Sequence, residues 1–173
     1  METPGAMVKR ESPPKRTVPK ASRPYMPGYE MMFGKGLLPW SWAVKQLSRS
    51  HNYWIATVRS DGRPHLAGVW GVWLENMFYF TSGEGSRKAR NIHANPNVVL
   101  CPDRADRAVI VEGVAKKVAW SSVPPRFRPA YKKKYDWDID SSMGPAYVVR
   151  PRVVFGIIEN AGSSPGASRW RFR

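Results

Sequence analysis

Residues 53–81 have the sequence YWIATVRSDGRPHLAGVWGVWLENMFYFT, in which three runs rich in aromatic and β-branched residues alternate with two short polar segments. Such runs favour β-strands. The expected strands are 53–58, 64–74 and 77–81. Asp61-Gly62 tolerates positive φ at little cost and predicts a tight turn, and Glu75-Asn76 predicts a second one. Three strands joined by hairpins form an antiparallel meander.

The rest of the chain continues the β pattern. Further strands are expected at 98–101, 107–118, 148–158 and 168–172. Short helices are expected at 39–47, where apolar residues recur at helical spacing, and from Ser86 to about Ala94, before Asn95-Pro96. The segment 122–140 is expected to be helical or irregular. Six or seven antiparallel strands must close or stack to protect their edges, so the sequence predicts a mainly β fold, a small barrel with short helices.

The length of 173 residues fits one domain with a tail. Residues 1–28 hold six prolines, scattered basic residues and almost no aliphatic side chains. We therefore expect a flexible, basic, proline-rich arm over residues 1–35 and the folded domain over residues 36–173. A solvated tail is the simplest interpretation of the arm. The alternatives are an arm that wraps a partner subunit and one that contacts nucleic acid.

Composition limits the cellular setting. The single cysteine, Cys101, cannot form an internal disulfide, and a reducing cytoplasm is the simplest compartment for it. No run approaches the roughly 18 apolar residues of a membrane span, and no secretory signal follows Lys9 and Arg10. We expect a cytoplasmic protein that does not bind membranes. The formal net charge of +15 attracts anions of every kind and does not choose among them.

The segment 80–88 has the features of an anion site. An expected strand ends in hydroxyl residues, passes through glycines and enters a helix capped by Ser86. Free N–H groups at a helix start favour a negative ligand, which would also relieve the conflict between the helix dipole and Arg87 and Lys88. The alternative is an ordinary capped helix with a solvated basic end. The candidate residues are Phe80, Thr81, Ser82, Ser86, Arg87 and Lys88.

Two glycines, Gly68 and Gly71, interrupt the strand expected at 64–74. Glycine weakens a strand and needs a physical reason, such as close approach by a flat ligand. Because side chains alternate along a strand, Gly68 and Trp70 share one face and are candidates to contact such a ligand. The alternative is that the glycines make room for large tryptophans of neighbouring strands.

In order and spacing these segments resemble the core of the pyridoxamine 5′-phosphate oxidase-like superfamily, and more narrowly its flavin/deazaflavin oxidoreductases. The resemblance covers residues 40–118 well and 145–173 loosely. The segments that carry it are 53–58, 61–65, 78–81, 86–91, 95–98, 111–113 and 169–172.

The resemblance implies a homodimer of split β-barrels with cofactor clefts between the subunits. It implies that Ser86, Arg87 and Lys88 contact the cofactor phosphate and that the end of the preceding strand lines the site. It also suggests Trp170 and Arg171 as contacts from the dimer cleft. Pyridoxamine phosphate oxidases carry an Arg and a Lys on the second strand, and residues 65–72 contain neither. The vitamin B6 reaction is therefore not expected, and deazaflavin F420, or FMN bound differently, fits better.

The resulting hypothesis is an oxidoreductase that transfers a hydride between FMN or F420 and a small organic substrate. Its catalytic residues are not identified, and the histidines and Cys101 lack metal-site spacing. A basic cluster is one candidate to bind the polyglutamate tail of F420, and a solvated face is the alternative. This cluster consists of Arg126, Arg128, Lys132, Lys133 and Lys134. One alternative is a non-catalytic module that binds or senses a flavin or F420. A nucleic-acid-binding protein is a further alternative, and it is the one that we expect least.

Overall fold

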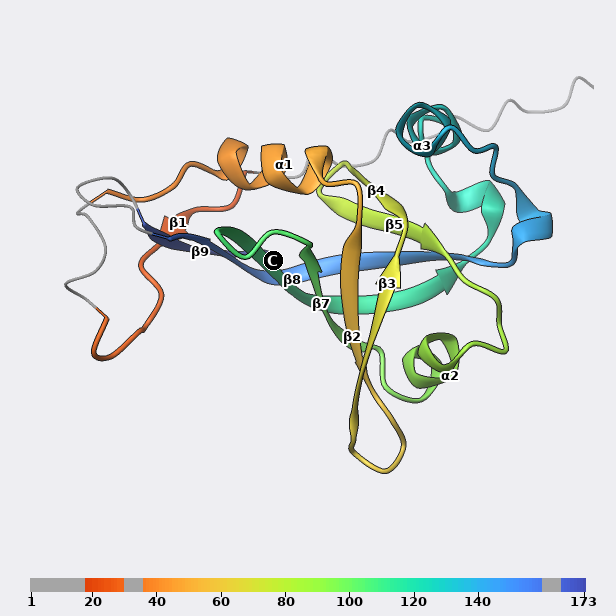
Figure 1. Cartoon of the computed structure of the whole chain (residues 1–173), viewed down its shortest axis with the longest axis horizontal. Helices are drawn as coiled ribbons and strands as arrows, with labels where there is room; N and C mark the ends of the chain where they lie inside the picture. Colours follow the sequence, from red (N-terminus) through yellow and green to blue (C-terminus); the bar gives the residue numbers. More distant parts are fainter. Residues whose placement is uncertain (1–17, 30–35, 160–165) are drawn as a thin grey trace, which may run out of the picture.

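The computed structural model describes residues 18–29, 36–159 and 166–173. It is an antiparallel sheet with helices α1 (Trp40–Arg49), α2 (Arg87–Ala94) and α3 (Phe127–Tyr135) packed around it (Figure 1). The strands are β1 (Ala21–Ser22), β2 (Tyr53–Val58), β3 (Pro64–Val69), β4 (Gly71–Leu74), β5 (Met77–Thr81), β6 (Asn97–Pro102), β7 (Arg107–Val118), β8 (Ala146–Ile158) and β9 (Ala167–Arg171). The mainly β fold with short helices is confirmed.

The sheet curls into an open barrel. Its order is β1-β9-β8-β7-β6-β2-β3, and β5 pairs with β8 and with β4. The strands β5, β8, β7, β6, β2 and β3 form a continuous path, in which each strand pairs with the next. β4 pairs with β5, and only Trp70 separates β4 from β3, so the two ends of the path come together at Trp70. No ladder joins β3 to β5 there. The barrel therefore has a split between β3 and β5.

The expected single strand over 64–74 and the three-strand meander are wrong in this region. The chain breaks at Trp70, so β3 pairs with β2 while β4 pairs with β5. Both faces of the chain are covered just after the break, since Trp73 packs in the main core and Val72 packs in a second cluster with α3. This break and the two-residue β1 account for nine strands where at most seven were expected.

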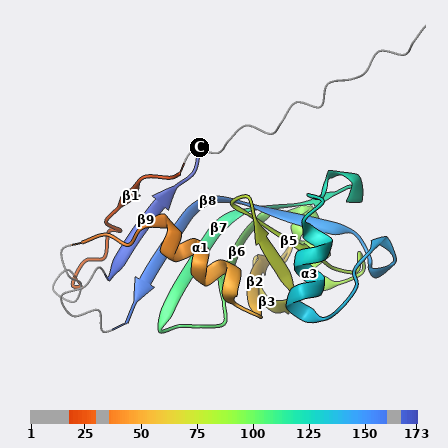
Figure 2. The same cartoon turned by 90° about the horizontal axis from the view of Figure 1, so that it is seen from above.

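All three helices lie where helical segments were expected, although their ends shift. Helix α1 buries Trp40, Ala43 and Leu47. Seen from above (Figure 2), α1 and α3 lie on the same face of the sheet. Helix α2 begins after Ser86, as predicted, and lies below the sheet in Figure 1. Among the described residues, no helix is long and apolar enough to cross a bilayer.

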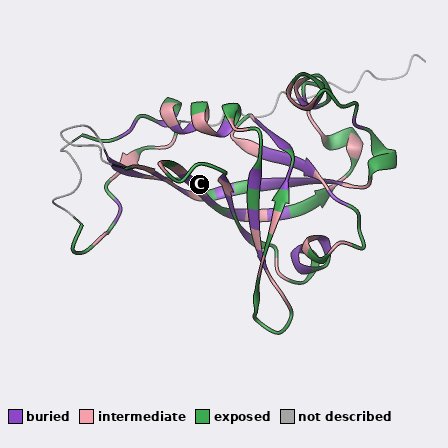
Figure 3. Cartoon of the chain, in the orientation of Figure 1, coloured by how far each residue is buried: buried purple, intermediate pink, exposed green. Residues whose placement is uncertain are grey.

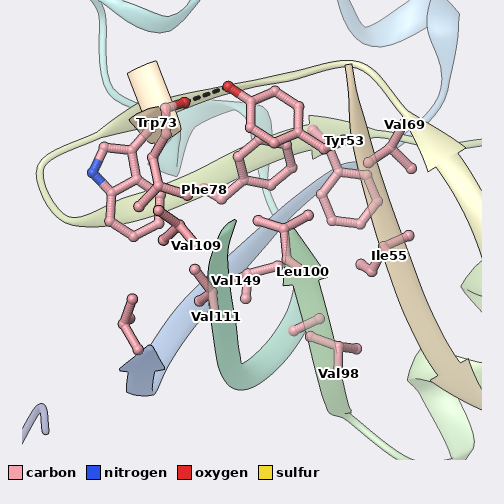
Figure 4. Packing of buried hydrophobic residues seen from close by; sticks show 14 of the residues in the cluster. Tyr53, Ile55, Val69, Trp73, Phe78, Val98, Leu100, Val109, Val111 and Val149 are labelled. Carbon is pink, nitrogen blue, oxygen red and sulfur yellow. Dashed lines mark hydrogen bonds between the residues drawn. The ribbon is translucent and has the colours of Figure 1, made fainter. Parts of the chain in front are cut away.

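The main core lies between α1 and the inner face of the curled sheet (Figures 3 and 4). Tyr53, Ile55 and Leu100 have no accessible surface, and Phe78 lies against the Tyr53 ring with centroids 4.6 Å apart. A smaller cluster holds α3 to β4, β5 and β8. It contains Val72, Tyr79, Phe127, Tyr131, Ile139 and Val148.

Part of the expected arm joins the sheet. Residues 1–17 and 30–35 lie outside the described residues, but Ala21 and Ser22 pair with β9 opposite Trp170 and Arg169. The Ser22 hydroxyl also donates to the Arg169 carbonyl over 3.3 Å. Ala21 and Ser22 therefore extend the edge of the sheet, while the flexibility expected of the arm stays a prediction.

Candidate cofactor-binding site

A short polar connection links the end of β5 to the start of α2. The hydroxyl oxygens of Ser82 and Ser86 are 2.9 Å apart. Ser86 Oγ accepts a bond from the Ala89 N–H at 3.2 Å, and the Ser86 N–H donates to the Gly83 carbonyl at 3.0 Å. The predicted helix cap is confirmed. It satisfies two of the four N–H groups that a helix start leaves without helical partners.

The other two of these N–H groups belong to Arg87 and Lys88. Within the described part of the chain, neither of these side chains has an ion pair or a hydrogen bond, and that of Arg87 is exposed. The one carboxylate of the connection, Glu84, is ion-paired with Lys117, which lowers the pKa of Glu84. Two cations and two free N–H groups thus meet at a positive helix end, an arrangement that stabilises a bound anion.

A buried polar cluster ties α2 to the strands beside it. Asn91 Nδ2 donates to Thr57 Oγ1 at 2.9 Å, and Thr57 Oγ1 lies 3.3 Å from Nδ1 of His65. Thr57 and Asn91 are only 2% and 4% exposed. This cluster was not predicted from the sequence. The available signal was that Thr57 is polar on a strand face otherwise formed by Tyr53 and Ile55.

The free edge of β3 faces the split. β3 pairs with β2 along one edge, and no described strand pairs with the other. Alternate residues of an edge strand direct their N–H and C=O groups away from the sheet, so β3 offers unpaired hydrogen-bonding groups there. His65, near the start of β3, connects through Thr57 to the α2 side of the split.

Gly68 and Trp70 lie at an open pocket. A Cβ on Gly68 would meet only Trp54 Cζ3, at 4.0 Å. Gly68, Trp54 and Trp70 help line a pocket of about 470 Å³. The Trp70 indole stacks on Tyr135 with centroids 4.8 Å apart and an angle of 9° between the rings. Trp70 Nε1 also donates to Asn52 Oδ1 at 3.2 Å, so the indole is held in one orientation.

The two positions therefore require glycine for different physical reasons. Gly68 has room for a ligand, as the flat-ligand interpretation requires. A Cβ on Gly71 would lie 2.5 Å from the Tyr79 carbonyl oxygen and 2.8 Å from Phe78 Cε1. Gly71 thus fits the alternative interpretation, with the aromatic ring supplied by phenylalanine rather than tryptophan.

Helix α3 directs one lysine side chain, that of Lys134, toward β2 and the start of β4. Lys134 Nζ donates to the Tyr53 hydroxyl at 2.6 Å and to the Gly71 carbonyl at 3.1 Å. Burial lowers the pKa of Lys134 to about 8. Burial also raises the pKa of Tyr53 and of Tyr135, whose hydroxyl donates to the same carbonyl at 2.9 Å.

The basic cluster considered for a cofactor tail is not one uniform patch. Lys134 points into the fold, and Lys132 forms ion pairs with Asp136 and Asp138 at 3.4 and 3.0 Å. Arg128 lies over the Trp120 ring at 5.3 Å. The exposed charge of this region is therefore smaller than its composition indicates.

The structure does not bring all the candidate residues together. Phe80 and Trp170 have no accessible surface, since Phe80 packs between Phe78 and Tyr147 and Trp170 packs against Trp40. This corrects the expectation that Phe80 and Trp170 contact a ligand, because both side chains are buried in the hydrophobic core. Arg171 is exposed on β9, near the sheet edge remote from β3. Thr81 ends β5 directly before the polar connection.

Comparisons with known proteins support the fold. Residues 43–156 match the family model described as pyridoxamine 5′-phosphate oxidase. A comparison with curated proteins found no match. A solved F420 reductase is 29% identical with a TM-score of 0.53, over 64% of this chain and 93% of that one.

Two further solved structures show the fold alone. General Stress Protein 26 from Bacillus anthracis str. Sterne is 21% identical with a TM-score of 0.57, over 68% of this chain and 92% of that one. A heme binding protein from Mycobacterium smegmatis is 16% identical with a TM-score of 0.59, over 77% of this chain and 59% of that one.

Proposed function

The chain belongs to the pyridoxamine 5′-phosphate oxidase family, and from this premise we propose that it is an oxidoreductase that transfers a hydride between F420 or FMN and a small organic substrate. The observation that carries the proposal is the polar start of α2, a helix that the Asn91–Thr57 hydrogen bond ties to β2. There, Arg87 and Lys88 have no ionic partner among the described residues, and two N–H groups are free. A phosphorylated cofactor is the anion that such a site in this family would bind.

The residues present fit such a cofactor. The hydroxyls of Ser82 and Ser86, with Arg87 and Lys88, would hold its phosphate through charge-assisted hydrogen bonds. Gly68 leaves room for a planar ring against the β3 backbone. When bound, either cofactor supplies the hydride chemistry that protein side chains lack.

The protein's own contribution is to position the cofactor and exclude water. The Thr57–Asn91 bond fixes α2, and with it the two cations, relative to β2. The stacked Trp70 indole closes one side of the pocket at Gly68, where displacement of water strengthens every polar contact. We assign no residue of this chain to proton transfer.

We propose F420 rather than FMN as the working cofactor. β3 carries no Arg or Lys, whereas pyridoxamine phosphate oxidases use such a pair on FMN. The F420 reductase among the solved relatives supports the same choice. The rings of the two cofactors are nearly isosteric, so discrimination would depend on the anionic tail of F420.

The proposal is tested by titrating the protein with FMN and with F420 at low and high salt. Replacing Arg87 and Lys88 by glutamine removes bonds that contribute about 1.5–3 kcal/mol each, so both affinities are expected to fall at least about tenfold. The matched control, Arg126→Gln with Lys133→Gln, also removes two cations, and FMN binding should not change. If F420 is preferred through its tail, the same control should weaken F420 binding, and its salt dependence should be steeper.

Unchanged FMN and F420 affinity in the Arg87/Lys88 variant would refute the site. Steady-state turnover with the reduced cofactor separates an enzyme from a binding or sensing module. Stoichiometric binding without turnover of any reducible substrate would remove the oxidoreductase part of the proposal.

We also propose that the chain is a homodimer, as the family resemblance implies. The outer face of β2, β3 and β6 exposes Trp54, Leu66 and Val99, and Leu66 and Val99 flank Ala56 from either side. A shallow pocket of about 420 Å³ continues this apolar face toward β8. Leu66→Lys with Val99→Lys should therefore give monomers by light scattering. A wild-type chain that is monomeric at micromolar concentration would contradict the proposal.

A further inference from the structure

A second concave site, which is basic, lies on α1 next to the pocket at Gly68, with which it shares Asp103. The second half of α1 and the connection from β6 to β7 enclose a pocket of about 530 Å³. Figure 1 shows α1 above the sheet and α2 below it, so the cations at the start of α2 do not reach this pocket. The lining residues are Trp42, Lys45, Gln46, Arg49, Ser50, His51, Pro102, Asp103, Arg104 and Arg107.

Positive charge dominates the pocket. Its four permanent cations are Lys45, Arg49, Arg104 and Arg107. Two carboxylates lie nearby, and they offset only part of this positive charge. Asp106 is ion-paired with Arg104, and Asp103 accepts a hydrogen bond from the Ser50 hydroxyl at 2.9 Å. Across the part of the chain that the structure describes, Lys45 and Arg49 form no ion pair.

The stability of α1 accounts for only one of these four cations. Arg49 lies in the last turn of α1, where a cation favours the helix dipole. Lys45 lies one turn earlier, four residues from Arg49, where two like charges repel each other. Arg107 adds a third cation from the start of β7. A bound anion would convert this repulsion into attraction.

The shape of the pocket selects a compact ligand. Trp42 packs firmly on the sheet, because a Cβ on Gly156 would lie 2.8 Å from Trp42 Cζ3. The Trp42 indole therefore provides a rigid wall beside the cations. The volume lies in the usual range for small-molecule sites. Arginine binds phosphate oxygens through two parallel hydrogen bonds, which a phosphate or diphosphate satisfies.

We propose that this pocket binds the phosphate or diphosphate group of a small molecule other than the cofactor. The test is calorimetric titration with inorganic pyrophosphate, using the full chain with Arg87→Gln and Lys88→Gln so that the start of α2 does not contribute. Binding is expected in this background. Adding Lys45→Gln and Arg49→Gln should weaken it at least about tenfold, since two charge-assisted contacts are lost. Adding Lys116→Gln and Arg150→Gln instead, which removes two exposed cations outside both proposed sites, should leave it unchanged.

The outcomes separate a built site from diffuse surface charge. No pyrophosphate binding in the Arg87/Lys88 background overturns the proposal. Equal weakening by both added pairs also overturns it, because total charge would then explain the binding. As a second readout, the Trp42 indole N–H resonance, assigned with Trp42→Phe, should shift on titration. A short single-stranded oligonucleotide that displaces pyrophosphate at equal concentration would show a nucleic-acid surface instead and would also overturn the proposal.

Discussion

Gly71 and Gly68 lie close together at the break between β3 and β4, yet alanine should act on them in opposite ways. At Gly71 the added methyl group would lie 2.5 Å from the Tyr79 carbonyl oxygen and 2.8 Å from Phe78 Cε1. The first neighbour is backbone of the paired strand β5, and Phe78 is fully buried. Neither neighbour can move without disturbing the core.

The magnitude follows from these contacts. Inserting one methyl group into a packed core costs about 1–3 kcal/mol, and the backbone clash places Gly71→Ala near the upper end of this range. For a domain of this size, about 2–3 kcal/mol corresponds to a fall in Tm of roughly 5–10 °C. At Gly68 the nearest atom is 4.0 Å away, so Gly68→Ala should change the free energy of unfolding by less than about 0.5 kcal/mol.

Urea denaturation and cofactor titration of the two variants provide the assay. Gly71→Ala should unfold at lower urea concentration with an unchanged m-value, because the loss is one of stability. Gly68→Ala should keep wild-type stability but weaken FMN and F420 binding, because its methyl group fills the space for the ring. Equal stability of Gly71→Ala and wild type, or a Gly68→Ala variant with wild-type affinity, would refute the assignment of these two glycines.

Three further predictions follow from the polar and aromatic contacts. Asn91→Ala removes the bond to Thr57 and should cost about 1–3 kcal/mol by urea denaturation, since the buried Thr57 hydroxyl loses the amide that donates to it. Burial lowers the pKa of Lys134 to about 8, below its value in the unfolded chain, so between these two values the unfolded state binds more protons and stability rises with pH. The stability difference between Lys134→Met and wild type should therefore shift in favour of wild type from about pH 7 to about pH 9.5, and a pH-independent difference would contradict the lowered pKa. Trp70→Ala removes the indole stacked on Tyr135 and should weaken cofactor binding about tenfold in a fluorescence titration. An unchanged affinity would mean that the cofactor ring does not bind beside Trp70.

Local patterns in the sequence were enough to predict most of the strands and helices. β2, β5 and β7 follow from runs of β-branched and aromatic residues, and the start of α2 follows from Ser86 as its cap. The break at Trp70 could not be predicted in this way. It depends on contacts of Gly71 with β5, and nothing in the local sequence distinguishes Gly71 from Gly68.

The candidate site was predictable only where it is local. The β5–α2 connection is continuous in sequence, so its hydroxyls and cations could be found together. The buried cluster of Thr57, His65 and Asn91 depends on two strands and a helix meeting in space. The orientation of the lysine side chains on α3 could not be predicted either. Lys133 and Lys134 are neighbours in sequence, but only Lys134 points into the fold.

The central claim is that the start of α2 holds a phosphorylated flavin or deazaflavin. The most direct measurement is the visible absorption spectrum and native mass of the purified chain, taken after incubation with F420 and FMN and removal of unbound ligand. Wild-type protein should retain one cofactor per chain, with F420 retained in preference to FMN. The variant with Arg87→Gln and Lys88→Gln should retain neither. Wild-type protein that retains no flavin or F420, or that carries haem instead, would contradict the account.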